Sequence, residues 1–203
     1  MIRPRRAVYF DLETGGVTEK HPDIQLAAIA IDEETWAEVD AFEAKIRFEI
    51  ADADPEALKM NAYDREVWDR DAITPAATCV GFADFLNRHR SLELVSKRTG
   101  RPYGVAKLVG HNAASFDGPR LMSLFKKHEQ FLPADPRVRD TCQRAFWYFD
   151  ETGLAPPENY KLATLCRHFG IEVIESHEAL ADVRLTVKLA RKLRELALER
   201  RAA

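Results

Sequence analysis

The sequence predicts an α/β domain with a mixed β-sheet, and two observations support this prediction. The chain opens with three segments that read as strands joined by short turns, which is typical of an antiparallel meander. Its second half alternates short apolar strands with helical segments, as α/β folds do. A chain of 203 residues fits one compact unit, so we expect a single domain over residues 1–203.

The expected meander lies near the start of the chain. Residues 7–10 form an apolar run typical of a buried strand, and residues 24–31 and 36–48 contain apolar runs or alternation that indicate two more. The acidic segment 32–35 is the expected turn between the last two. We therefore expect three neighbouring strands.

A helical region follows from Pro55 to residue 89. Pro55 and Pro75 stand where a helix can begin, because proline is tolerated in the first turn. Phe82, Phe85 and Leu86 recur at spacings of three and four, which predicts one buried face. Residues 91–104 mix glycine, proline and basic residues, so we expect an irregular excursion or a hairpin there.

Strands and helices alternate in the second half. Residues 107–110 form a short apolar strand, and a helix is expected to start near Pro119 and bury Leu121, Leu124 and Phe125. Another strand contains Val138 and ends near Asp140, whose side chain is placed to cap the next helix.

The remaining helices are predicted over residues 141–149, 161–169 and 178–200. Gly170 is expected to end the second of these. The aromatic run 146–149 lies within the first. Aromatic side chains can stack on bases, but four in succession point around a helix, so core packing is expected for most of them.

The composition is that of a soluble globular chain, with 46% apolar and 31% charged residues. No apolar stretch approaches the roughly 20 residues of a membrane span, and the start of the chain does not resemble a signal peptide. We therefore expect no membrane partner and a cytoplasmic location. Three widely spaced cysteines are expected to be reduced core thiols: Cys79, Cys142 and Cys166.

The net charge of −3 does not favour a nucleic-acid partner, but net charge averages over sites. A chain with an excess of carboxylates can still bind a nucleic acid, because positive charge is needed only along the path of the strand. Two basic regions meet that need, although solvated surface charge is an equally good interpretation of each. They are Arg88, Arg90, Lys97, Arg98, Arg101 and Lys107, and Lys188, Arg191, Lys192 and Arg194.

Asp11 and Glu13 end the first expected strand, just before a glycine turn at residues 15 and 16. Side chains alternate across a strand, so these two carboxylates face the same way while Leu12 faces the opposite layer. Active sites of α/β folds gather at the carboxyl ends of such strands. The pair therefore suits a divalent metal, although an acid-x-acid pair alone is weak evidence.

Two further clusters contain candidate functional residues. The segment 111–117 ends in Asp117 and lies between a strand and a helix, where Asp117 has an alternative role as a plain helix cap. The segment 177–182 contains His177 and Asp182. Positions five apart do not share a helix face, so His177 is expected in the preceding loop and Asp182 on the helix.

The clusters occur in a fixed order: an Asp-x-Glu strand end, an Asn-x-x-x-Phe-Asp loop and a His-x-Ala-x-x-Asp helix start. In this arrangement the chain resembles the DEDDh branch of the DnaQ-like, ribonuclease-H-like 3′-to-5′ exonucleases. That family includes polymerase proofreading subunits and small RNA-trimming enzymes. The resemblance covers roughly residues 6–195.

The resemblance implies a ribonuclease-H-like five-stranded mixed sheet flanked by helices, and two divalent cations, Mg²⁺ or Mn²⁺. Asp11, Glu13, Asp117 and Asp182 would hold the cations, and His177 would be the general base that takes a proton from the attacking water. Two ions about 3.5–4 Å apart stabilise the attacking and leaving oxygens of an in-line displacement. The implied product is a nucleoside 5′-monophosphate.

Substrate contacts are implied for three further residues: Thr14, Val17 and Asn112. The position after Thr14 is often a second threonine in the family, whereas this chain has Gly15 there. That difference affects the expected contacts to the terminal nucleotide.

The expected partner is the 3′ end of a single-stranded nucleic acid. DNA and RNA remain open, because their discrimination rests on contacts to the 2′-hydroxyl, and an RNA-trimming exoribonuclease is the alternative within this class. A nuclease-like binding module without activity is the alternative from another class; the presence of all five expected catalytic residues argues against it. A polymerase or repair partner is a further expectation, and the oligomeric state is left open.

Overall fold

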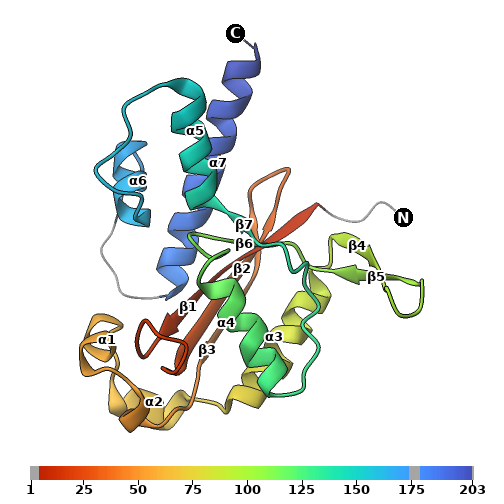
Figure 1. Ribbon diagram of the computed structural model, residues 1–203, viewed down its shortest axis with the longest axis vertical. Coiled ribbons are helices and arrows are strands. Elements are labelled where there is room, and N and C mark those ends of the chain that lie inside the picture. Colours follow the sequence, from red (N-terminus) through yellow and green to blue (C-terminus); the bar gives the residue numbers. More distant parts are fainter. Residues whose placement is uncertain (1–4, 174–178, 203) are drawn as a thin grey trace.

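The computed structural model describes residues 5–173 and 179–202. A five-stranded sheet in the order β3-β2-β1-β6-β7 forms its centre (Figure 1). Its strands are β1 (Arg6–Thr14), β2 (Asp23–Asp32), β3 (Glu38–Lys45), β6 (Leu108–Gly110) and β7 (Arg139–Asp140). β1, β2 and β3 pair antiparallel, whereas β6 is parallel to β1 and β7 is parallel to β6. The predicted meander and the mixed sheet are therefore confirmed.

Seven α-helices surround the sheet in the described part of the chain. They are α1 (Pro55–Met60), α2 (Arg65–Asp71), α3 (Pro75–Arg88), α4 (Asp117–Lys127), α5 (Thr141–Thr152), α6 (Leu162–His168) and α7 (Ala179–Ala202). A 3₁₀ turn, η1 (Ile50–Asp52), precedes α1. No helix in residues 5–173 or 179–202 is both long and apolar enough to cross a membrane.

One face of the sheet is covered by α3 and α4. Val8, Phe10 and Leu12 of β1 point to this side and pack against Phe82 and Phe125 of the two helices. Leu26, Ala28 and Ala30 of β2 and the predicted buried face of α3 complete this core. Its driving force is burial of apolar area, about 25 cal/mol per Å².

The opposite face is covered by α7. Ala7 and Tyr9 alternate with the residues above and pack against Ala179 and Val183 of α7. Helices α5 and α6 pack on the outer side of α7, through a core that includes Leu189. In Figure 1 these three helices lie together above the sheet, while α3 and α4 lie below and in front of it.

The predicted helical region 55–89 consists of three helices, α1, α2 and α3. Pro55 and Pro75 stand at the first positions of α1 and α3, as predicted. Asp64 begins α2 by accepting a hydrogen bond from Val67 N at 3.0 Å. The indole of Trp68 donates to the Ile24 carbonyl at 3.2 Å, so α2 closes the end of the sheet.

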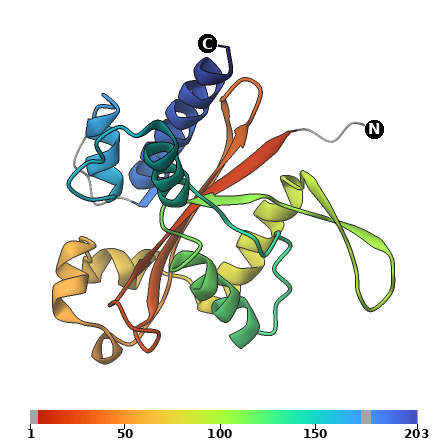
Figure 2. The same ribbon diagram turned by 45° about the horizontal axis from the view of Figure 1, so that its top comes forward.

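The excursion at residues 91–104 is a hairpin of β4 (Leu92–Val95) and β5 (Pro102–Val105). Figure 2 shows it extending away from the sheet and helices. Lys97, Arg98 and Arg101 lie at its exposed tip. Two other predicted basic residues are paired within the fold, Lys107 with Glu33 and Arg88 with Asp40.

Two sequence-based expectations are wrong in detail. The helix expected near Pro119 begins at Asp117, so Pro119 is its third residue. The aromatic run divides between core and surface: Phe149 is buried, whereas Trp147 is 64% exposed and Phe146 stacks on Tyr160 with ring centres 3.9 Å apart. The cysteines are free and buried, as expected.

Candidate active site

Three carboxylates meet between the end of β1 and the start of α7. Asp11 and Glu13 project from β1 on the side covered by α7, because their positions alternate with Leu12. Asp182 comes from the first turn of α7. One oxygen from each of the three carboxylates lies within 4.8 Å of the others, and all three residues are part-buried.

A fourth carboxylate, Asp117, joins them from the first turn of α4. It is 4% exposed, and its Oδ1 accepts a hydrogen bond from Leu12 N at 3.2 Å. Strand β6 ends at Gly110, which pairs with β7, and so leaves this part of the β1 edge to be satisfied by a side chain. Asp117 is thus held against the backbone between Asp11 and Glu13, and it is a residue of the helix rather than its cap.

Burial and mutual repulsion raise the pKa values of three carboxyl groups in this cluster. Burial, with the charges of Asp117 and Glu13, raises the pKa of Asp11 well above its usual range. Burial, with the charges of Asp182 and Asp117, raises the pKa of Glu13 from 4.5 to about 7. Burial also raises the pKa of Asp117 to about 6, although its hydrogen bond from Leu12 acts in the opposite direction.

The donor set fits a hard divalent cation. Carboxylate oxygens are the ligands that Mg²⁺ and Mn²⁺ prefer, and three of them already converge to within 4.8 Å. Four acids packed this closely repel one another, so a bound cation would relieve a cost that the protein alone meets by retaining protons. Asp11, Glu13, Asp182 and the adjacent Asp117 are the residues that would hold it.

The loop after β1 is tightly packed. The Thr14 hydroxyl donates to the Gly16 carbonyl at 2.9 Å, and the Thr14 carbonyl accepts from Asn61 Nδ2 at 2.8 Å. A Cβ on Gly15 would lie 2.8 Å from the Cβ of Ala53, which explains why a second threonine is not accommodated here. Val17, at the tip of the loop, is 85% exposed.

The loop between β6 and α4 is held by α5. Asp140 caps α5 as predicted, accepting from Cys142 N at 2.8 Å, and it also accepts from Asn112 N at 3.0 Å and Ala114 N at 2.9 Å. His111 contacts Thr141 Oγ1 at 2.8 Å through Nδ1. These contacts fix the segment that leads to Asp117.

The other predicted site residues lie around these loops. Thr14 is the last residue of β1 and Val17 lies in the loop after it, whereas Asn112 is exposed in the loop before α4, with a left-handed φ of 57°. His177 lies outside the described residues, which end at Val173 and resume at Ala179. The expectation of a loop position for His177 is therefore left as a prediction.

Sequence reasoning missed two supporting residues. Asn61 holds the Thr14 carbonyl, and Arg120 donates to Asp23 Oδ1 at 2.8 Å and to the His21 carbonyl at 2.7 Å. Neither belongs to a motif, and their partners lie 47 to 99 positions away in sequence. Among the residues that support the site, Asp140 was predicted from the sequence, as a helix cap.

Comparison with known proteins identifies the family. The family model described as Exonuclease (RNase_T) matches residues 83–190, just over half of the chain. That range includes Asp117, His177 and Asp182, and begins after β1. The PolC-type DNA polymerase III of Bacillus subtilis strain 168 is 34% identical over 93 residues, which cover 46% of this chain and 6% of that polymerase.

Solved structures agree on the fold. The zinc-bound complex of E. coli exonuclease I with single-stranded DNA matches with a TM-score of 0.72 and 18% identity, over 95% of this chain and 41% of that one. E. coli exonuclease I with a dA16 oligonucleotide matches with a TM-score of 0.69 and 19% identity, over 94% and 41%. This chain thus spans about two fifths of those exonucleases and a small part of the polymerase.

The resemblance predicted from the three motifs is confirmed at the level of the exonuclease family, and the predicted fold of a five-stranded mixed sheet flanked by helices is confirmed as well. The chain belongs to the exonuclease family that the RNase_T family model describes.

Proposed function

We propose that this protein removes nucleotides one at a time from the 3′ end of single-stranded DNA, releasing nucleoside 5′-monophosphates as a DEDDh exonuclease. The observation that carries the proposal is the convergence of Asp11, Glu13 and Asp182, with Asp117 held beside them by Leu12 N. The chain's membership of the exonuclease family sets the reaction class.

Asp11, Glu13, Asp117 and Asp182 are proposed to hold two divalent cations, Mg²⁺ or Mn²⁺. Bound there, the cations would supply Lewis acidity and positive charge against the developing charge of a phosphodiester undergoing in-line displacement. The protein's own part is preorganisation. β1 aligns Asp11 and Glu13 on one face, and the Leu12 amide fixes Asp117 by a hydrogen bond.

His177 is proposed to take the proton of the attacking water. An imidazole has an ordinary pKa near 6.5, which suits a base at neutral pH. Its spacing of five residues from Asp182 matches the motif of the family. Loss of this base should slow the reaction without removing a cation ligand.

Two loops are proposed to hold the terminal nucleotide. Val17 is exposed in the loop that follows Glu13, and Asn112 is exposed in the loop that leads to Asp117. Thr14 supports the first loop, because its hydroxyl donates a hydrogen bond to the Gly16 carbonyl. Val17 thus follows Glu13 in the sequence, and Asn112 precedes Asp117.

DNA is proposed over RNA because E. coli exonuclease I, which shares this fold, is seen with single-stranded DNA and a dA16 oligonucleotide. A polymerase or repair partner stays a prediction. The similarity of this chain to a region of PolC-type polymerase III motivates that prediction.

The test is digestion of 5′-labelled single-stranded DNA and RNA of equal sequence, with Mg²⁺, Mn²⁺ or chelator, resolved as a ladder over time. A metal-dependent ladder that shortens from the 3′ end, faster for DNA, is expected. Faster shortening of RNA would support the exoribonuclease alternative, and no cleavage of either would support a binding module.

Matched variants separate the roles. Asp182→Asn keeps the side-chain shape and removes one ligand charge, so activity should fall below detection, whereas Asp150→Asn at an exposed position of α5 should match the unmodified protein. His177→Ala should lower the rate and flatten its dependence on pH between about 6 and 8. Full activity of Asp182→Asn would contradict the metal-ligand assignment.

A further inference from the structure

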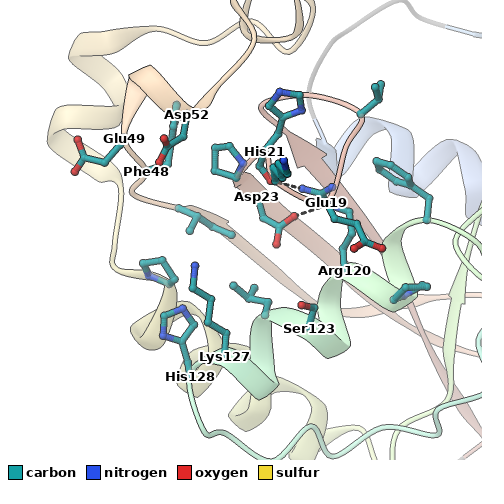
Figure 3. A pocket seen from close by; sticks show the side chains of 18 of the residues that line it. Glu19, His21, Asp23, Phe48, Glu49, Asp52, Arg120, Ser123, Lys127 and His128 are labelled. Carbon is teal, nitrogen blue, oxygen red and sulfur yellow. Dashed lines mark hydrogen bonds and ion pairs between the residues drawn. The ribbon is translucent and has the colours of Figure 1, made fainter.

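A pocket of about 620 Å³ lies between the loop after β1 and the start of α4 (Figure 3). Its walls come from the loop after β1, the segment after β3, and α4. Because α4 covers the face of the sheet opposite α7, the α4 wall of the pocket lies on the other face of the sheet from Asp11 and Glu13. None of the four proposed metal ligands lines it, yet Val17 and Phe116, next to Asp117, form its border.

The wall that the loop after β1 forms with α4 is built around a buried cation. Arg120 is 9% exposed, and its three guanidinium nitrogens donate to Asp23 Oδ1 at 2.8 Å, the Thr18 carbonyl at 3.0 Å and the His21 carbonyl at 2.7 Å. The loop after β1 is therefore fixed to α4, whose first residue is Asp117. A pocket with such a wall exists before any ligand binds, which reduces the cost of ordering.

The lining is chemically balanced. Its formally charged side chains comprise four bases and four acids: Lys20, Arg47, Arg120 and Lys127, and Glu19, Asp23, Glu49 and Asp52. Apolar surface from Ile46, Phe48 and Leu124 lies between them. A net-neutral lining of this kind suits a flat neutral ring with polar edges better than it suits a cluster of phosphates.

The size agrees with this interpretation. Pockets for small ligands range over about 300–1,000 Å³, combining apolar walls with a few polar groups. Ser123, and the carboxylate of Asp23 beside Arg120, face the pocket in Figure 3 and could meet the hydrogen-bonding edge of a base. Lys127 stands at the rim, where it could meet an adjoining phosphate.

We propose that this pocket binds the base of an unpaired nucleotide upstream of the one being removed. The inference rests on the proposed exonuclease function and gives its preference for a single strand a structural basis. A base in a pocket cannot remain paired, so the pocket favours a single strand over a blunt duplex. It also makes affinity depend on more of the strand than its terminal nucleotide.

The test fills the pocket without touching the carboxylates. Ser123→Trp places an indole in the pocket from an exposed position of α4, and Met122→Trp places the same group one residue away, outside the lining. Binding of a 5′-fluorescein single-stranded DNA 12-mer is measured by anisotropy in chelator. Hydrolysis of the p-nitrophenyl ester of thymidine 5′-monophosphate, which contains one nucleotide, is measured with Mg²⁺.

Ser123→Trp should weaken binding of the 12-mer at least about fivefold, the low end of what one stacked base contributes, and leave kcat/KM for the ester unchanged. Met122→Trp should change neither, and a blunt 12-base-pair duplex should bind Ser123→Trp and the unmodified protein alike. Unchanged binding of the 12-mer, or equal losses on 12-mer and ester, would overturn the proposal. If the unmodified protein hydrolysed no substrate, the exonuclease proposal would fail, while the anisotropy would still decide whether the pocket binds a strand.

Discussion

Replacing Glu13 by glutamine should stabilise the metal-free protein at high pH and not at low pH. The folded-state pKa of Glu13 is about 7, raised from 4.5 by burial and by the charges of Asp182 and Asp117. Below about pH 4.5 the carboxyl is protonated in both states and costs nothing. As the pH rises from about 4.5 to about 7, stability is lost, because the unfolded chain ionises first and the folded protein must then bear the charge.

The difference between a pKa of 4.5 and one of about 7 corresponds to about 3 kcal/mol. For a domain of this size, 1 kcal/mol shifts the melting temperature by roughly 2–4 °C, so Glu13→Gln should gain about 6–12 °C at pH 8. The gain should vanish near pH 4.5. Adding Mg²⁺ at pH 8 should stabilise the unmodified protein more than the variant, because the cation also relieves the repulsion.

The assay is thermal unfolding followed by circular dichroism, in chelator, at pH 4.5, 6 and 8. Glu34→Gln, at an exposed turn position away from the cluster, is the control for removing one negative charge. A gain for Glu13→Gln that is equal at all three pH values, or no larger than that of Glu34→Gln, would refute the reasoning from like-charge repulsion.

Other perturbations give distinct expectations. Mg²⁺ affinity, measured by calorimetry, should fall as the pH drops from 7.5 to 5.5, since Glu13 and Asp117 have pKa values of about 7 and 6 and must lose protons to bind; an affinity independent of pH would contradict those values. Chelator should abolish DNA degradation and excess Mn²⁺ should restore it; activity that persists in chelator would exclude the cation requirement. Arg120→Met should cost about 3–5 kcal/mol in chemical denaturation, because Asp23 loses its buried partner, and adding Asp23→Asn should recover part of the loss; equal stability of the single and double variants would count against the ion pair.

The strands of the fold were predictable because their signal is local. β2 was expected over residues 24–31 and spans Asp23–Asp32, since one continuous apolar run defines a strand buried on both faces. The start of α4 was not predictable in the same way. Phe116 precedes it without a side-chain cap, and Pro119 fits at the third position because the first amides of a helix lack intrahelical acceptors.

The aromatic run on α5 shows what local pattern cannot decide. Successive residues point about 100° apart around a helix, and only one side of α5 faces α7. Phe149 therefore enters the core, whereas Trp147 faces solvent. Which side of a helix is buried depends on its neighbours, and the sequence of α5 alone does not name them.

In the candidate site too, local pattern predicts some residues, whereas the positions of others depend on tertiary contacts. Asp11 and Glu13 could be assigned to one face of a strand from alternation alone, and the structure places them together with Asp182. The buttressing by Arg120 depends on contacts across about a hundred residues, at a position where the sequence shows only a lone basic residue. Such contacts arise from packing, which periodicity does not encode.

The four bonds to Asp140 have a consequence for how the active-site loop opens. One carboxylate accepts the amides of Asn112 and Ala114 from the loop, and of Cys142 and Gln143 from the first turn of α5. Because both amides are hydrogen-bonded, they should be protected from hydrogen exchange although both residues are exposed on the surface. Their exchange rates should rise together whenever this single acceptor is released, which makes Asn112 and Ala114 reporters of motion in the segment that carries Asp117.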